Sequence, residues 1–164
     1  MKNYSEIKDE PISFGASDTF TLQGRVESIL WHQSGSFETL LQRNTVVNVG
    51  KAEIMGLTNA TTTGPFLWLA IGDGTAAPGT TDTALVSELQ RGSATASRTT
   101  TIFTNDTAQW VHTFNFTIAD TINEAAVFDE AASTTGVMLA RATIGPYPVG
   151  SGDSLQLTYK LQVT

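Results

Sequence analysis

The sequence predicts a mainly β protein, an antiparallel β-sandwich or jelly roll that carries one or two short helices. Three observations support this class. Only 15% of the 164 residues are charged, and Thr and Ser supply much of the other polarity, which suits the solvent face of strands. Apolar and polar residues alternate along several stretches, and Gly, Pro and Asp separate these stretches at short intervals. Helices do not alternate with strands, so a sandwich is favoured over a βαβ fold.

The bulk composition indicates one folded domain that does not bind nucleic acid. The hydrophobic fraction of 40% is large enough to form a core. The net charge of -7 repels phosphate backbones, and the nine Lys and Arg residues are scattered along the chain. Without cysteine there are no disulfides or thiolate metal sites. We expect no cofactor. No apolar stretch resembles a secretory signal or a membrane span, so we also expect no membrane partner and synthesis in a cytoplasm.

The chain divides into an N-terminal arm, residues 1–18, and a single β-sandwich domain, residues 19–164. The first 18 residues are polar, contain Pro11 and Gly15, and show no sustained period. We interpret them as an extended arm, with a frayed terminus as an equal alternative.

The domain opens with strands. Apolar and polar residues alternate from Phe20 to Val26, which predicts a strand, and residues 29–31 either continue it or start another. A turn at residues 34–36 then leads into a second short strand at residues 37–42.

Residues 44–57 are the best helix candidate, because apolar residues recur there at intervals of three or four. Asn44 or Thr45 is the expected N-cap. Gly50 would cost this helix roughly 1 kcal/mol relative to Ala, a cost that is tolerated where a helix packs closely on a sheet.

A continuous apolar run at residues 66–71 predicts a strand that is buried on both faces. The loop that follows is rich in Gly, Asp, Thr and Pro. Asp82 is the expected N-cap of one or two helical turns over residues 83–90, with a strand there as the alternative.

From residue 98 onward the pattern predicts strands only. Trp110, His112, Phe114, Phe116 and Ile118 form one alternating apolar face. Turns are expected at residues 145–148 and 150–153, and the final alternation is the clearest in the chain. The predicted strands cover residues 98–104, 110–118, 121–128, 136–144 and 155–163.

The sequence shows no catalytic or metal-binding pattern, so we expect a protein that is not an enzyme. His112 lies on an apolar face, where a satisfied imidazole is far more common than a metal ligand. The Gly72-Asp-Gly-Thr75 segment lacks the alternate oxygen ligands of a calcium loop and is better explained as a turn. Glu124, Asp129 and Glu130 are close in sequence, and a pair of carboxylates is the machinery of glycoside hydrolysis. A solvated sheet edge is the simpler interpretation.

Several motifs, in a fixed order, resemble a pattern found in structural proteins of tailed-bacteriophage virions. The resemblance covers residues 44–164, and residues 1–43 lie outside it. One departure is Ala126, where the pattern has Gly. The motifs are Asn44-Thr-Val-Val-Asn-Val-Gly50, Leu69-Ala-Ile-Gly-Asp-Gly-Thr75, Asp82-Thr-Ala-Leu85, Glu88, Arg91, Ile122-Asn-Glu-Ala-Ala-Val-Phe-Asp129, Gly136-Val-Met-Leu-Ala-Arg-Ala142 and Gly152-Asp-Ser-Leu155.

The resemblance implies a capsid decoration (cement) protein on the exterior of the virion head, with the major capsid protein as partner and a homotrimer as the expected assembly. Under this hypothesis the arm attaches the protein to the shell, and Ile12 and Phe14 are its apolar anchors. The alternatives are a tail or tail-fibre component that binds host glycans through residues 72–81, and a small glycan hydrolase that uses Glu124 or Asp129.

Overall fold

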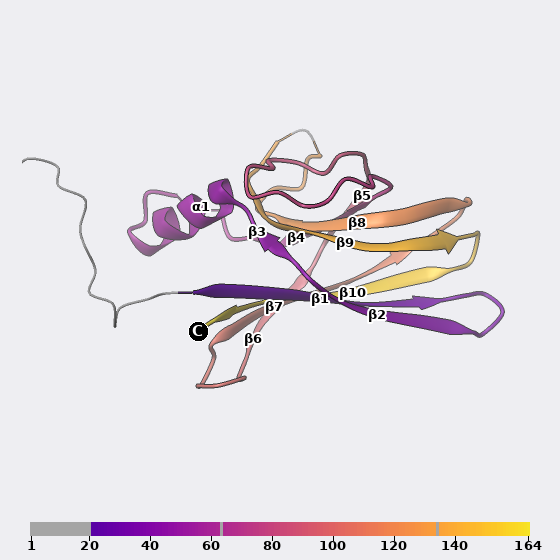
Figure 1. The fold of residues 1–164 in the computed structure, drawn as a ribbon, viewed down its shortest axis with the longest axis horizontal. Helices are drawn as coiled ribbons and strands as arrows, with labels where there is room; N and C mark the ends of the chain where they lie inside the picture. The colour runs from indigo at the N-terminus through magenta and orange to yellow at the C-terminus, as the bar shows by residue number, and fades with distance from the viewer. Residues whose placement is uncertain (1–20, 63, 134) are drawn as a thin grey trace, which may run out of the picture.

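Two five-stranded antiparallel sheets stack face to face and enclose the main core (Figure 1). This computed structural model describes residues 21–62, 64–133 and 135–164, so the predicted arm and its anchors Ile12 and Phe14 lie outside the described residues. The mainly β class and the two antiparallel sheets are confirmed, while the more specific jelly-roll connectivity stays a prediction.

Each sheet has a simple strand order. Sheet A runs β2 (Phe37–Arg43), β1 (Leu22–Trp31), β10 (Ser154–Val163), β7 (Thr107–Asn115) and β6 (Thr95–Thr99). Sheet B runs β3 (Thr45–Val46), β9 (Met138–Val149), β8 (Asp120–Phe128), β4 (Trp68–Gly72) and β5 (Glu88–Ser93). The helix α1 (Asn48–Thr58) packs against β9 at the side of sheet B.

The alternation read from the sequence sets the core face of sheet A. In β10 the apolar residues Leu155, Leu157 and Tyr159 are fully buried, while their polar neighbours face outward. β1 forms a single strand that pairs with β10 along its whole length, so the predicted segments 20–26 and 29–31 join. The terminal strand predicted at 155–163 is confirmed, and it is central to its sheet.

Polar contacts between the sheets fix how they stack. The hydroxyls of Ser28 on β1 and Tyr147 on β9 form a buried hydrogen bond of 2.9 Å. Burial raises the pKa of the Tyr147 phenol, and the Ser28 contact opposes that rise. Trp110 on β7 donates its indole N–H to the carbonyl of Phe66 at 2.6 Å. Each contact satisfies a polar group that the core would otherwise leave unpaired.

The chain passes between the sheets four times, and at two of these crossings a single residue forms the corner. Asn44 separates β2 in sheet A from β3 in sheet B, and Ala94 separates β5 from β6. Strands that switch sheets in this way make the corners of a sandwich. As a result, the edge strand β2 of sheet A leads directly into the edge strand β3 of sheet B. In the same way, the edge strand β5 of sheet B leads into the edge strand β6 of sheet A.

The first corner explains why the helix starts later than predicted. The expected caps Asn44 and Thr45 are wrong, because these residues form the corner and β3, and the N-cap position is Val47, which makes no side-chain cap hydrogen bond. The expected close packing is confirmed. An added Cβ at Gly50 would lie 2.4 Å from the carbonyl oxygen of Leu139 on β9.

Four other predictions were wrong in detail. The helical turns expected over residues 83–90 do not form, because Asp82 contacts a distant arginine, and the alternative of a strand is confirmed only from Glu88, where β5 begins. The strand expected at 98–104 lies at 95–99, and Ile118, expected on the inner face, is 70% exposed beyond the end of β7. The turn expected at 145–148 is part of β9, which continues to pair with β8 through residues 147–149.

We predict that Gly50→Ala destabilises the protein even though alanine is the better helix former. The added methyl group meets the backbone of Leu139, which cannot move aside as a side chain can, and overpacking of this kind costs about 1–3 kcal/mol. Gly56→Ala in the same helix is the matched control, because the atoms nearest its Cβ belong to the side chains of Thr62 and Thr61 and not to the backbone. Urea unfolding monitored by circular dichroism measures both, and equal midpoints would contradict the close packing.

Candidate functional site

The two outer faces of the sandwich differ, and the difference begins with a row of residues across sheet B. Paired positions on neighbouring strands place Arg91, Ala70, Ala126 and Arg141 side by side on its outer face. The two alanines leave room above the sheet between the two arginines. Apolar side chains, including Leu85 from the loop after β4, fill that room and form a second small core with Phe128 and Met138.

Arg141 ties the loop after β4 onto this face. Its Nε donates to Oε2 of Glu124 at 2.8 Å, and Nη2 lies 2.7 Å from the same oxygen. Its Nη1 donates to Asp82 at 2.7 Å, and Nη2 also donates to the carbonyl of Ala76 at 2.9 Å. Arg141 and Glu124 are buried, so both charges have left water and depend on each other.

The carboxylate of Glu124 completes the attachment of the loop. It accepts the backbone N–H of Val86 at 3.2 Å and that of Ser87 at 2.9 Å. The backbone N–H of Gly79, followed by the guanidinium of Arg141, lowers the pKa of Asp82 below its usual value. The loop of residues 73–87 is therefore held by charge-assisted hydrogen bonds at several points along its length.

Arg91 holds a second loop in the same way. Its guanidinium forms a bidentate pair with Glu88, at 2.9 Å and 2.7 Å, and stacks 3.7 Å above the ring of Phe128. Its Nη1 donates to the carbonyls of Glu130 and Ala132 at 2.9 Å. Bidentate and stacking contacts of this type require arginine rather than lysine. Figure 1 shows the resulting layer of loops above sheet B.

The structure therefore brings together five charged residues of the motifs that resemble virion proteins. Asp82, Glu124 and Arg141 form one cluster, and Glu88 and Arg91 form the other. Both oxygens of Glu124 accept hydrogen bonds and the residue has no exposed surface, so the acid proposed for a glycan hydrolase has no access to substrate. Asp129 accepts the backbone N–H of Val137 at 2.6 Å and closes the loop between β8 and β9.

The remaining candidates also have structural partners. The Nδ1 atom of His112 lies 2.8 Å from the carbonyl oxygen of Ser93, and its ring packs edge-on against Phe114. The carbonyl of Asp73, in the predicted turn, accepts a hydrogen bond from Asn123. Across the described ranges no group of three His, Asp or Glu side chains is arranged to hold a metal ion.

In contrast, the outer face of sheet A is uncovered among the described residues. Figure 1 shows the helix and the loop layer on the side of sheet B, and α1 contacts β9. Directly paired residues Trp31 and Phe37 lie on this open face with 37% and 66% of their surface exposed, and Leu41 is 60% exposed. These three side chains form what we call the apolar patch. Large exposed apolar groups gathered on one face are typical of a protein interaction surface.

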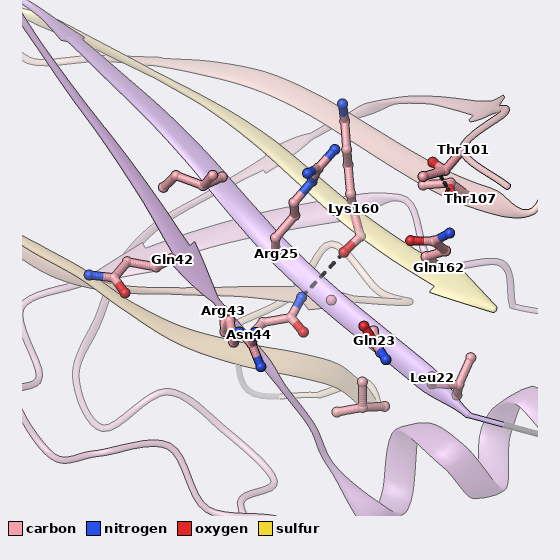
Figure 2. A pocket seen from close by; sticks show the side chains of 13 residues that line it. Leu22, Gln23, Arg25, Gln42, Arg43, Asn44, Thr101, Thr107, Lys160 and Gln162 are labelled. Carbon is pink, nitrogen blue, oxygen red and sulfur yellow. Dashed lines mark hydrogen bonds between the residues drawn. The ribbon is translucent and has the colours of Figure 1, made fainter. Parts of the chain in front are cut away.

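A row of three cations lies beside the apolar patch. Arg25 on β1 pairs directly with Arg43 on β2 and with Lys160 on β10. Figure 2 shows Arg25 and Lys160 projecting side by side from neighbouring strands. Like charges at directly opposed positions destabilise a sheet, and none of the three forms an ion pair within the described part of the chain. This basic row therefore suits an anionic partner.

The basic row borders a groove of about 630 Å³, in which amides and hydroxyls surround the cations. Its polar lining comes from Gln23, Arg25, Gln42, Arg43, Asn44, Thr101, Thr107, Lys160 and Gln162 (Figure 2). Sequence reasoning missed this site because the cations are far apart in the chain. The signal was present in the strand alternation, since Arg25 and Lys160 both occupy outward positions of strands predicted from the sequence.

Asp106 lies next to this groove, but its carboxylate is already occupied. It accepts backbone N–H groups from Thr101, Ile102 and Phe103 at 2.7–3.2 Å, and the side-chain amide of Gln162 at 3.2 Å. Burial alone would raise the pKa of Asp106, but the backbone hydrogen bonds and one from the Thr107 hydroxyl outweigh it and hold the pKa well below the usual range. The Asp106 carboxylate therefore binds the backbone of residues 101–103 and does not pair with the basic row.

Comparison with known protein families, curated proteins and solved structures finds no match to this chain. In the described ranges, no helix has the length and apolar character that crossing a membrane requires.

We predict that Glu124→Gln destabilises the fold by about 3 kcal/mol or more, because it leaves the buried Arg141 charge only partly compensated. Glu27→Gln, an exposed residue on sheet A, is the matched control and should change stability by about 0.5 kcal/mol or less. Chemical denaturation gives both free energies of unfolding. A Glu124→Gln protein as stable as the control would contradict the anchoring role of the cluster.

We also predict a pH-dependent contribution from His32, at the end of β1. Hydrogen bonds to Glu38 and then to Asp153, each 3.2 Å, raise the pKa of His32 above 6.5. A raised folded-state pKa gives stability that is fully present below about pH 6.5 and is lost as the pH rises through the folded value. The difference in melting temperature between the natural protein and His32→Gln should therefore shrink as the pH rises. A difference in melting temperature that stays constant with pH would contradict the stabilising role of protonated His32.

Proposed function

We propose that this chain is a non-enzymatic structural protein of a tailed-bacteriophage virion, and specifically a decoration protein that binds the exterior of the assembled head. The observation that carries the proposal is the contrast between the two outer faces. The face of sheet B is sealed by loops tied to Arg141 and Arg91, whereas the face of sheet A presents the apolar patch. A molecule built this way has one face available for a large partner.

The size and chemistry of the open face favour a protein partner. Trp31, Phe37 and Leu41 stand on two adjacent strands, and aromatic residues are enriched in protein interfaces relative to other surfaces. The basic row next to them adds charge complementarity, which orients a partner and speeds its association. Five charged residues of the motifs that resemble virion proteins form the clusters that seal the other face, which also supports the proposal.

The proposed activity is stabilisation by mass action. A protein that binds the assembled shell but not free capsid subunits stabilises the shell by RT ln(1 + [L]/Kd). The major capsid protein is the proposed partner, and a homotrimer around a local three-fold axis is the proposed assembly. The net charge of -7 suits the exterior surface, which does not meet packaged DNA.

We predict a copy number of the same order as that of the major capsid protein when purified virions are measured by quantitative gel densitometry. Phe37→Asp should greatly reduce the amount that binds to heads lacking the protein, because it places a charge in the apolar patch. Ile118→Asp is the matched control, since Ile118 is equally exposed but lies beyond the end of β7. A few copies at the tail would contradict decoration and favour the tail component that binds glycans. Equal binding by both variants would contradict the apolar patch as the contact.

A further inference from the structure

The outer edge of β2 carries unused backbone hydrogen-bonding groups. β2 is the edge strand of sheet A and pairs only with β1 within the described part of the chain. The backbone N–H groups of His32 and Asn44 donate to Ser36 and Gly24 across the β1–β2 hairpin. Bonded and non-bonded positions alternate in antiparallel pairs, and the register here has no shift. The N–H and C=O groups of the four intervening odd-numbered residues, 37, 39, 41 and 43, therefore point away from β1.

This edge lacks three of the usual protections against strand addition. Natural edge strands are blunted by proline, bulges, short length, or charged side chains, including ones that point inward. Glu38 is such an inward charge, but its carboxylate is 3.2 Å from the ring of His32. β2 is seven residues long and has no proline, and its register with β1 is regular. The residues whose backbone groups point outward also place their side chains on the open face of sheet A. Phe37, Leu41 and Arg43 then offer two apolar contacts and a cation to any strand that pairs there.

One segment of this chain has the complementary pattern. Glu10, Ile12 and Phe14 lie at a spacing of two residues, so in a strand one acidic side chain and two apolar side chains share a face. We propose that residues 10–14 of a neighbouring copy add to the outer edge of β2 as an antiparallel strand. The proposal assigns Ile12 and Phe14 to contact between copies, in place of the shell contact expected from the sequence, so it goes beyond the attachment to the head proposed above.

In this antiparallel register, the side chains of residues 10–14 face side chains of β2 that suit them in charge and apolar character. With Glu10 opposite Arg43, Ile12 falls opposite Leu41 and Phe14 opposite Thr39, diagonal to Phe37. The carboxylate then meets the basic row, and the two apolar groups extend the apolar patch. Pro11 falls at a position whose N–H would point away from β2, where a missing donor costs no hydrogen bond.

The reach of the chain favours a neighbouring copy over the same molecule. Phe14 opposite Thr39 would lie level with Ile29, seven residues along β1 from Leu22. The connection would have to reverse and then cover about 24 Å along the strands and about 10 Å across them. Eight residue steps span at most about 28 Å, which leaves almost nothing for the reversal. A second copy has no such constraint, and head-to-tail exchange of this kind closes into rings such as the proposed trimer.

Engineered cysteines test the pairing directly, because the chain has no cysteine of its own. Full-length Ile12→Cys and Leu41→Cys proteins are mixed and oxidised mildly. We expect a covalent species at twice 17.5 kDa on a non-reducing gel, with a disulfide between residues 12 and 41 identified by mass spectrometry. Thr95→Cys on β6, the opposite edge strand of the same sheet, replaces Leu41→Cys as the control and should lose this species. Equal cross-linking of both pairs, or none with Leu41→Cys, would overturn the proposal.

A charge swap separates specific pairing from chance collision. Glu10→Arg alone and Arg43→Glu alone should each reduce the cross-link, and mixing the two should restore it. Arg98→Glu on β6 makes the same charge change and should have no effect. If one chain carrying both cysteines forms the disulfide within itself, the contact is not between copies and the proposal fails. These measurements use no virions, so their failure leaves the proposed attachment to the head to be judged separately.

Discussion

The buried pairing of Arg141 with Glu124 is the interaction on which the rest of this structure depends. The two residues lie on adjacent strands of sheet B, and through Asp82, Ala76, Val86 and Ser87 they hold a loop that has no regular secondary structure. A buried ion pair contributes little net stability compared with apolar packing, but removing one partner is costly. Its role here is to select one arrangement of the loop, and so to cover Leu85 and the second core.

That selection explains the asymmetry of the molecule. An uncovered sheet B would expose apolar groups such as Phe128 and Met138 on its outer face, and the sandwich would then present two apolar faces. Because the two arginines fix loops above that face, Phe128 and Met138 are buried, whereas Trp31, Phe37 and Leu41 stay exposed on sheet A; on the other side of the sandwich, Val86 and Leu89 are also exposed. The alanines at positions 70 and 126 are part of this arrangement, since larger side chains in the row would displace the loops. One face thus serves stability and the other is available for binding.

The parts of the fold that sequence reasoning recovered are those set by local period. β10 was predicted nearly to the residue, because its alternation is uninterrupted, and β8 was predicted nearly to the residue although its second half is a continuous buried run. The missed features depend on distant residues. Asp82 looked like a helix cap, but its partner is Arg141, 59 positions later. The basic row was seen only as scattered cations, because three positions far apart in the chain meet through strand register.

The orientation of the sandwich on its partner tests this account most directly. A cryo-EM reconstruction of intact virions, with the protein fitted into the density, would show which outer face meets the neighbouring subunits. The account predicts that the outer face of sheet A lies against the head and that the loop layer over sheet B faces solvent. Contact through the loops held by Arg141 and Arg91, with the apolar patch left in solvent, would contradict it.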